Sequence, residues 1–204
     1  MKFKVGCFYS EDTLYQQIYQ DYLLKSCKKF NLDCNVLSSP NYNSWNRNVS
    51  EKPRVISEML DLFLDKGELL VFLDADCTIE QYPYLFEQIP PEYDIGFHTL
   101  NWNDWYGYNN TPPTMELLTG TMFFRNRKKV RELCREWYSI ASKTKEWEQK
   151  VLQKIIGKYD LKIYPLPLEY CYIKSRPQNK PPLVKLDPVI LHHQVSRELK
   201  KRRL

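Results

Sequence analysis

Two carboxylates separated by one residue, Asp74 and Asp76, directly follow a strand-like apolar stretch over residues 68–73. Such neighbours repel each other, and they are stable as a pair when a cation lies between or beyond them. Carboxylate oxygens suit Mg²⁺ or Mn²⁺, and either ion can in turn hold a diphosphate. The pair therefore predicts a divalent-metal site, although a helix-capping Asp beside an exposed Asp would give the same spacing.

The same residues fit a second reaction class. Asp74, Asp76 and Thr78 match the Asp-x-Asp-x-Thr signature of haloacid-dehalogenase-type phosphatases, in which Asp74 would be the nucleophile and Asp76 the general acid/base. That fold carries its nucleophile on the first strand of the core, whereas here a strand–helix–strand–helix stretch comes first. A later acidic pair for Mg²⁺ is also missing from the sequence. A metal site that serves a diphosphate is therefore favoured over a phosphatase.

The elements that must position this pair alternate along the first part of the chain. Apolar periodicity predicts strands over 2–9, 32–37 and 68–73, and helices over 12–30 and 52–66. Parallel strands joined by crossover helices form a sheet that is covered on both faces. We therefore expect an α/β fold, a three-layer α/β/α sandwich with a mostly parallel central sheet. Ligands of such sheets bind beyond the carboxyl ends of the strands, where the acidic pair lies.

The rest of the chain continues this pattern with no visible boundary or repeat. Strands are expected over 93–98, 117–125, 161–164 and 189–192, helices over 128–142 and 146–156, and an aromatic loop over 101–113. We therefore expect one domain over residues 1–204.

Composition bounds the class of protein. The chain has 204 residues, of which 43% are hydrophobic and 27% charged, and this balance excludes a disordered chain. No apolar run approaches the roughly 20 residues of a membrane span, so we expect no transmembrane segment. The sequence starts as a strand rather than as a signal peptide. We therefore expect a cytoplasmic protein whose six cysteines are free thiols.

Charge is unevenly distributed along the sequence. The net formal charge is −8 over residues 1–124 and +13 over residues 125–204, which include a basic tail over about 197–204. An acidic half beside a basic half suggests a cation site in the first and a contact with a polyanion in the second, although basic helix faces also serve solubility. The tail is consistent with a solvated end or with a phosphate-binding arm.

Several short segments occur in an order that is typical of one superfamily. They are a Trp-x-x-Asn segment at 45–48, a Lys-Pro-x-x-Ile segment at 52–56, the acidic pair, a small-Gly-x-hydrophobic-Phe strand within 118–126, the helix start at 146–149 and the closing segment 190–193. In this order they resemble the GT-A nucleotide-diphospho-sugar glycosyltransferases over nearly the whole chain. The likeness is strongest to small members with a late metal-binding histidine, such as glycogenin-like and galactosyltransferase relatives. The sequence lacks their Lys-Pro-Trp ending, so it assigns neither a retaining nor an inverting mechanism.

The resemblance implies a role for each matching residue. Asp76, Asp74 and His192 would bind a Mn²⁺ or Mg²⁺ ion that neutralises the leaving diphosphate, and Asp74 could instead contact ribose and sugar hydroxyls. Strand alternation sends His192 and His193 to opposite faces, so at most one of them is a ligand. The residues implied to bind the donor, from base to sugar, are Tyr9, Ser10, Lys52, Asp74, Thr119, Gly120 and Thr121, and those implied to act near the anomeric carbon or the acceptor are Glu148 and Gln149.

The acceptor stays open between two classes. Trp102 and Trp105, within the loop over 101–113, could stack on an acceptor sugar or base, or could simply pack the loop. The basic second half keeps DNA with a hydroxymethylated base as a candidate, while a saccharide needs no such charge. No helix-turn-helix or zinc pattern is visible, which disfavours a non-catalytic nucleic-acid-binding domain. We therefore expect a metal-dependent glycosyltransferase that moves a sugar from a nucleotide-sugar donor, a UDP-sugar, to an acceptor hydroxyl, with a saccharide favoured.

Overall fold

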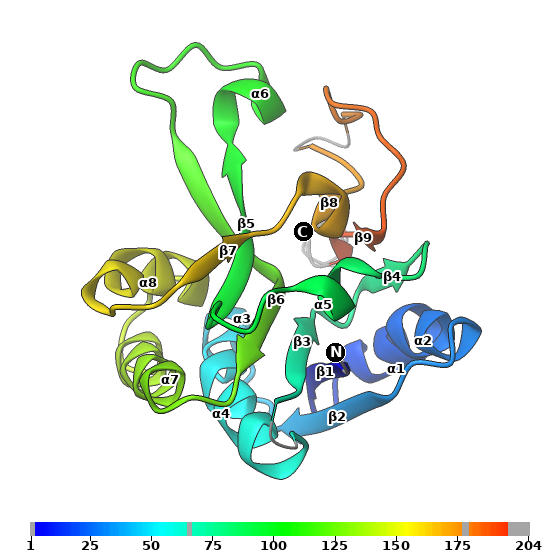
Figure 1. The fold of residues 1–204 in the computed structure, drawn as a ribbon, viewed down its shortest axis with the longest axis vertical. Coiled ribbons are helices and arrows are strands. Elements are labelled where there is room, and N and C mark those ends of the chain that lie inside the picture. Colours follow the sequence, from blue (N-terminus) through cyan, green and yellow to red (C-terminus); the bar gives the residue numbers. More distant parts are fainter. Residues whose placement is uncertain (1–2, 65–66, 177–179, 196–204) are drawn as a thin grey trace.

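The computed structural model describes residues 3–64, 67–176 and 180–195, and a six-stranded sheet forms its centre (Figure 1). Its strands are β1 (Phe3–Ser10), β2 (Cys34–Ser39), β3 (Leu69–Leu73), β5 (Ile95–Asn101), β6 (Met115–Arg125) and β7 (Ile163–Pro165). They lie in the order β2-β1-β3-β6-β5-β7. β6 runs antiparallel to both neighbours and the other pairs are parallel, so the expected mostly parallel sheet is confirmed.

Helices cover both faces of this sheet. The stretch predicted as one helix over 12–30 starts at Tyr15 and includes a π-helical turn, and the helix predicted over 52–66 starts with Pro53 in its first turn, where proline is well tolerated. The helical elements are α1 (Tyr15–Tyr19), η1 (Gln20–Leu24), α2 (Lys25–Lys29), α3 (Trp45–Val49), α4 (Lys52–Leu62), α5 (Leu85–Gln88), α6 (Trp102–Tyr106), α7 (Lys128–Ala141), α8 (Glu148–Ile155), η2 (Ile156–Lys158) and η3 (Leu168–Tyr170).

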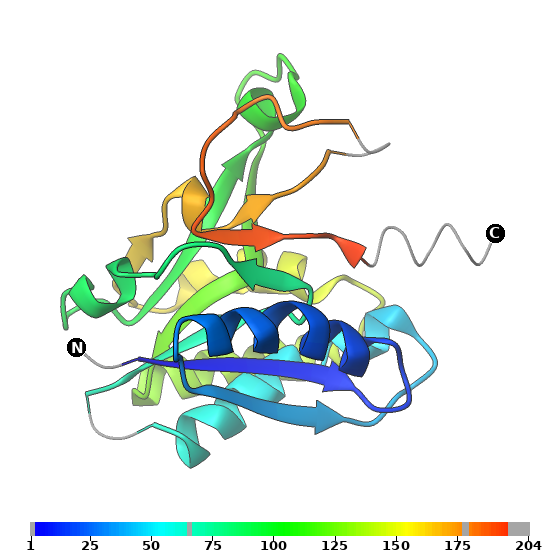
Figure 2. The same ribbon diagram turned by 90° about the vertical axis from the view of Figure 1, so that its right-hand side faces the viewer.

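The central strand β3 is buried on both faces, as its apolar sequence predicts. Leu70 and Phe72 belong to the core that α4, α7 and α8 cover. Leu69, Val71 and Leu73 belong to the opposite core, to which α1, η1 and α2 contribute. Figure 2 shows this second helical layer lying along β1. The three-layer α/β/α sandwich is therefore confirmed.

A second, three-stranded sheet lies beside the carboxyl end of β3, and only its last strand was predicted. It consists of β4 (Cys77–Ile79), β8 (Tyr172–Ile173) and β9 (Ile190–His192), in the order β4-β9-β8. β4 follows the acidic pair directly and pairs antiparallel with β9, so that Cys77 lies opposite His192. This pairing brings a strand from the end of the described chain to the acidic pair.

The aromatic segment expected as a loop over 101–113 contains the short helix α6. The Asn101 side chain accepts a hydrogen bond from the Asn103 N–H at 3.0 Å, and Gly107 ends the helix at a φ of +74°. β5 and β6 carry α6 away from the sheet as a projecting arm, here defined as residues 99–117 (Figure 1). The segment between β8 and β9 packs against this arm through Val184 and Leu186.

Three further predictions concern the chain as a whole. Within the described ranges, no helix combines the length and the apolar character that a membrane crossing requires. All six cysteines are free thiols, as expected. The basic tail predicted over about 197–204 lies outside the described residues.

Candidate active site

A cleft of about 1210 Å³ opens at the carboxyl ends of β1 and β3. Sites for one small molecule usually occupy about 300–1,000 Å³, so this cleft has room for more than one small molecule. The predicted site residues that line it are Tyr9, Ser10, Lys52, Asp74, Asp76, Trp102, Thr119, Gly120, Glu148, Gln149 and His192.

The two carboxylates of the acidic pair have different surroundings. Asp74 is 35% exposed, and its Oδ1 lies 2.9 Å from Lys52 Nζ. Asp76 is buried, and its Oδ2 accepts a hydrogen bond from the Val195 N–H at 2.8 Å. Burial, followed by the charge of Asp74, raises the pKa of Asp76 to about 6. A cation beside Asp76 would offset both causes and favour its charged form.

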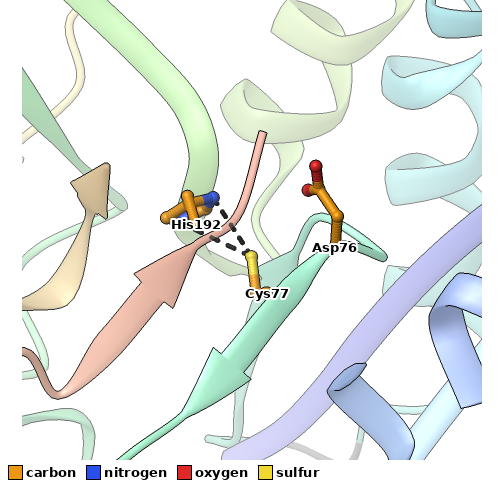
Figure 3. Close-up of side chains that lie close together, drawn as sticks. All are labelled: Asp76, Cys77 and His192. Carbon is orange, nitrogen blue, oxygen red and sulfur yellow. Dashed lines mark hydrogen bonds between the residues drawn. The ribbon is translucent and has the colours of Figure 1, made fainter. Parts of the chain in front are cut away.

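His192 reaches the acidic pair through the second sheet (Figure 3). Its Nδ1 lies 3.1 Å from Cys77 Sγ on the facing strand, and its Nε2 lies 2.8 Å from Thr121 Oγ1. Burial lowers the pKa of His192 to about 4, so the ring is neutral at neutral pH and one nitrogen carries a lone pair. One ligand atom each from Asp76, Cys77 and His192 lie within 4.8 Å of one another.

His193 points away from this cluster, as strand alternation predicts. Its Nε2 lies 2.9 Å from Thr78 Oγ1, and its ring meets the Tyr22 ring at a centroid distance of 4.6 Å. Of the two adjacent histidines, His192 is therefore the one that faces the acidic pair.

Gly120 forms the floor between Asp74 and His192. Its carbonyl accepts the Asp74 N–H at 2.9 Å, which extends the β3–β6 pairing past the end of β3. A Cβ at this position would lie 2.5 Å from His192 Cε1, 2.8 Å from His192 Nδ1 and 3.2 Å from Asp74 Oδ2, so only glycine fits. Asp74 and His192 thus meet over bare backbone, and a carboxylate oxygen of Asp76 lies within 4.8 Å of a ring nitrogen of His192. Carboxylate oxygens are ligands that suit Mn²⁺ or Mg²⁺.

Lys52 is buried among oxygen atoms on the other side of Asp74. Besides Asp74, its Nζ lies 3.2 Å from Glu148 Oε1 and from Thr119 Oγ1, and 3.3 Å from the Thr119 carbonyl oxygen. Burial lowers its pKa, but Asp74 and Glu148 outweigh that effect and leave the pKa of Lys52 raised. The lysine therefore stays charged and ties the acidic pair to the start of α8.

Glu148 is 1% exposed and uses only one of its carboxylate oxygens in hydrogen bonds. Its Oε1 accepts from Thr119 Oγ1 at 3.0 Å, whereas its Oε2 is buried with no hydrogen-bond partner among the described residues. Burial raises the pKa of Glu148, and Lys52 opposes the shift. A buried, unpartnered carboxylate oxygen beside the cleft is a group that a substrate hydroxyl could satisfy.

The sequence model of the nucleotide-diphospho-sugar transferase family matches residues 20–204, which include the acidic pair, Glu148 and His192. The chain belongs to this family. It is therefore a glycosyltransferase. A comparison with curated proteins finds no match.

Solved structures of glycosyltransferases share the fold of this chain. A glycosyltransferase involved in the glycosylation of the major capsid of PBCV-1 is 13% identical with a TM-score of 0.66, and 100% of each chain is covered. The bifunctional glycosyltransferase WbbM is 13% identical with a TM-score of 0.59, over 95% of this chain and 46% of that one. Mouse xyloside xylosyltransferase 1 is 8% identical with a TM-score of 0.51, over 96% of this chain and 99% of that one. The expected GT-A fold is confirmed.

In this glycosyltransferase, one carboxylate joins the cleft to the arm. Trp102 Nε1 donates to Glu116 Oε2 at 2.8 Å, and Gln149 Nε2 donates to Glu116 Oε1 at 2.8 Å. Gln149 Oε1 in turn accepts the Thr119 N–H at 3.1 Å. The indole of Trp102 is thereby fixed at the border of the cleft.

Two predicted residues do not line the cleft, and their expected roles are corrected. Trp105 is 1% exposed and packs against Tyr172, with ring centroids 5.7 Å apart, because the second sheet fills the space beneath α6. Its predicted contact with an acceptor is therefore wrong. Thr121 is fully buried and does not line the cleft, and its Oγ1 lies 2.8 Å from His192 Nε2.

Three residues of the site were missed by the sequence analysis. Cys77 and Cys171 flank His192, the latter with its Sγ 3.7 Å from Nε2, and Glu116 holds Trp102. The place of Cys77 directly after Asp76 was the available signal for the first of them. Cys171 and Glu116 carry no motif, since only the second sheet and the arm bring them to the cleft.

Proposed function

We propose that this glycosyltransferase moves a sugar from a nucleoside-diphosphate sugar, a UDP-sugar, to a saccharide hydroxyl with the help of Mn²⁺ or Mg²⁺. The observation that carries the proposal is that His192 meets Asp74 over the bare backbone of Gly120 and has a ring nitrogen within 4.8 Å of a carboxylate oxygen of Asp76. A bound Mn²⁺ or Mg²⁺ would neutralise charge on the diphosphate as it leaves.

The donor would lie along the carboxyl ends of β1 and β3. Tyr9 and Ser10 line the cleft at the end of β1, where they would contact the nucleotide base, and Thr119 and Gly120 line it where the sugar would lie. Lys52 was expected to bind the donor. Its charge is instead shared with Asp74 and Glu148, so we propose that it fixes these two carboxylates and acts on the phosphates only through them.

Of the two residues proposed to act at the anomeric carbon or the acceptor, Glu148 is the better candidate for the chemistry. Both amide atoms of Gln149 are engaged, by Glu116 and Thr119. Glu148 Oε2 is free of hydrogen bonds with described residues, and burial raises the pKa of the carboxyl, which makes the carboxylate a stronger base. We assign it to hold the acceptor hydroxyl and to receive its proton.

The charge of the cleft supports a saccharide acceptor over DNA. Among the described residues that line it, Asp12, Asp74, Asp76, Glu116 and Glu148 are acidic and only Lys52 and Lys150 are lysines. A polyanion would be repelled there. Many cations of the basic second half lie on α7, α8 and η2, where Lys129, Arg131, Lys154 and Lys158 each pair with a carboxylate. Trp102 offers the kind of aromatic face on which a sugar ring packs.

Calorimetry with UDP, GDP, CDP and ADP, each with and without Mn²⁺, tests the donor proposal. We expect tight binding of UDP only with the metal, and loss of that binding in Asp76→Asn but not in the control Asp61→Asn, an exposed position on α4. Absence of binding for all four nucleotides, with and without Mn²⁺, would contradict the proposed donor and the proposed metal dependence. Transfer to duplex DNA carrying hydroxymethylated bases, rather than to oligosaccharides, would overturn the acceptor assignment.

A further inference from the structure

The arm of residues 99–117 has a composition that sets it apart from the rest of the cleft. Apart from Asp104 and Glu116 it carries no charged residue, and it contains four asparagines, three threonines and four aromatic residues. Amides and hydroxyls form hydrogen bonds with uncharged polar groups, and aromatic rings offer flat apolar faces. A neutral sugar presents both hydroxyl groups and a flat face of C–H groups, so the arm matches its chemistry.

Three aromatic rings of the arm form one cluster, here called the aromatic platform: Trp102, Tyr106 and Tyr108. The ring centroid of Trp102 lies 5.6 Å from that of Tyr106 and 6.1 Å from that of Tyr108, and the two tyrosine rings stack at 5.5 Å. Trp102 and Tyr106 line the cleft, whereas Tyr108 lies beyond it and is 48% exposed. The platform therefore begins inside the cleft and continues onto the surface of the arm, which projects from the sheet (Figure 1).

Hydrogen bonds within the arm hold the platform in place without a ligand. Asn103 Nδ2 donates to the Asn110 carbonyl oxygen at 2.9 Å, and the Asn110 N–H donates to Asn103 Oδ1 at 3.1 Å. Asn110 Nδ2 donates to Thr114 Oγ1 at 3.0 Å, and the Trp102 N–H donates to the Thr114 carbonyl oxygen at 3.0 Å. These bonds close the loop that carries Tyr108, so little ordering is needed when a ligand binds.

Charge around the platform disfavours an anionic ligand. Residues 99–117 supply no lysine or arginine to a nucleic acid or an acidic polysaccharide. Arg176 reaches the arm from outside, but its Nε donates to the Pro181 carbonyl oxygen at 2.7 Å and its Nη1 to the Tyr106 carbonyl oxygen at 3.4 Å. The carboxylates of Asp104 and Glu116 would repel an anion.

We propose that Tyr106 and Tyr108 hold the second sugar unit of an acceptor whose first unit lies against Trp102, so that the acceptor is a neutral saccharide of at least two units. The first unit would present its hydroxyl to Glu148, because Glu116 joins Trp102 to Gln149, the neighbour of Glu148. The inference rests on the proposed transfer to a saccharide and adds the size and the charge of that saccharide.

Binding of the full chain to an array of neutral and acidic saccharides of one to six units, without donor, tests this inference. The chain is biotinylated and presented on streptavidin, so that several copies bind together and weak contacts become measurable. We expect binding to neutral saccharides of two or more units, and much weaker binding to single sugars and to acidic chains. Tyr108→Ala should weaken binding to the longer saccharides by at least about fivefold, whereas Tyr108→Phe, which keeps the ring, should bind like the wild type. The matched control Tyr84→Ala, at an exposed tyrosine beyond the cleft, should also bind like the wild type.

Several outcomes would overturn the inference. They are an absence of binding to any neutral saccharide, equal binding of single sugars and longer chains, preference for acidic chains, and binding by Tyr108→Ala at the wild-type level. A loss in Tyr84→Ala equal to that in Tyr108→Ala would overturn it as well. Failure of the proposed transferase function would appear differently, as absent UDP binding in calorimetry together with intact binding of saccharides to the array.

Discussion

The cleft contains two neighbouring clusters that balance their charges in different ways. Around Lys52, an ammonium group lies within ion-pair distance of Asp74 and Glu148, so the protein supplies its own cation. Around His192, a buried carboxylate lies near a thiol and a neutral imidazole, and no salt bridge to Asp76 is formed by a described residue. The first cluster already contains its cation, whereas an external cation would improve the electrostatics of the second.

Of the predicted changes, removal of the Asp76 carboxylate should have the largest effect, and that effect should be on sugar transfer rather than on stability. In Asp76→Asn we expect transfer to fall at least about a thousandfold, or about 4 kcal/mol of transition-state stabilisation, since the amide is a poor ligand for the metal. The amide oxygen can still accept the Val195 N–H, so the thermal unfolding midpoint should not fall. The rate of sugar transfer and a thermal melting curve measure the two effects. An Asp76→Asn enzyme that remained active would contradict the assignment of Asp76 as a metal ligand.

Removal of Lys52 should act on stability instead. Lys52→Met leaves Asp74 and Glu148 without their shared cation, and we expect a loss of about 3 kcal/mol in the unfolding free energy, at the low end for a broken buried ion pair because Asp74 is partly exposed. Urea unfolding at neutral pH measures the loss. The double variant Lys52→Met/Glu148→Gln should recover part of it, and a single variant as stable as the wild type would show that the network adds nothing.

Acidification should change the stability contributions of Asp76 and His192 in opposite directions. Asp76 has a folded-state pKa of about 6 against an ordinary 3.8, so the folded state binds the extra proton and its stability rises as the pH falls through 6. His192 has a folded-state pKa of about 4 against 6.5, so the unfolded state binds the extra proton and stability falls as the pH drops below 6.5. The two contributions nearly cancel in the wild type.

Variants of these two residues should therefore diverge from the wild type in opposite directions. Between pH 7 and about pH 4.5, the unfolding free energy of His192→Gln should rise by about 2 kcal/mol relative to the wild type, and that of Asp76→Asn should fall by about 2 kcal/mol. Urea unfolding in the absence of metal at the two pH values measures both. Parallel pH profiles for all three proteins would contradict the pKa shifts.

The smallest effect is expected at the arm. Trp102→Ala should raise the KM for a saccharide acceptor about fivefold, or about 1 kcal/mol, with little change in kcat or in nucleotide binding, because the indole borders the cleft away from the acidic pair. Tyr84→Ala, an exposed tyrosine beyond the cleft, serves as the control. A fall in kcat at unchanged KM would place Trp102 with the chemistry rather than with the acceptor.

Local sequence patterns predict the sheet and the acidic pair well but not the companions of that pair. The apolar run of β3 is sufficient to predict a strand buried on both faces, and the position of Asp74 at its carboxyl end follows from general rules of α/β sheets. The contact between Cys77 and His192 depends on a strand pairing between distant parts of the chain, which no periodicity encodes. The resemblance supplied His192, and the structure supplied the thiol.

The error at Trp105 has the same cause. Trp102 and Trp105 are indistinguishable as aromatic residues of one segment. They differ in burial because Tyr172 of β8 covers Trp105. A strand of only two residues has too short a pattern to be predicted from the sequence. Short strands stabilised mainly by tertiary contacts are therefore where sequence reasoning fails in this protein.

Glu116 limits how the arm could be exchanged between related enzymes. Because its two oxygens join Trp102 of the arm to Gln149 of α8, an exchange of the arm for that of a relative would break a contact with α8 unless the acidic residue came with it. For anyone redesigning this transferase, the useful boundary of the exchangeable module runs between Glu116 and the tip, not at the base of the sheet.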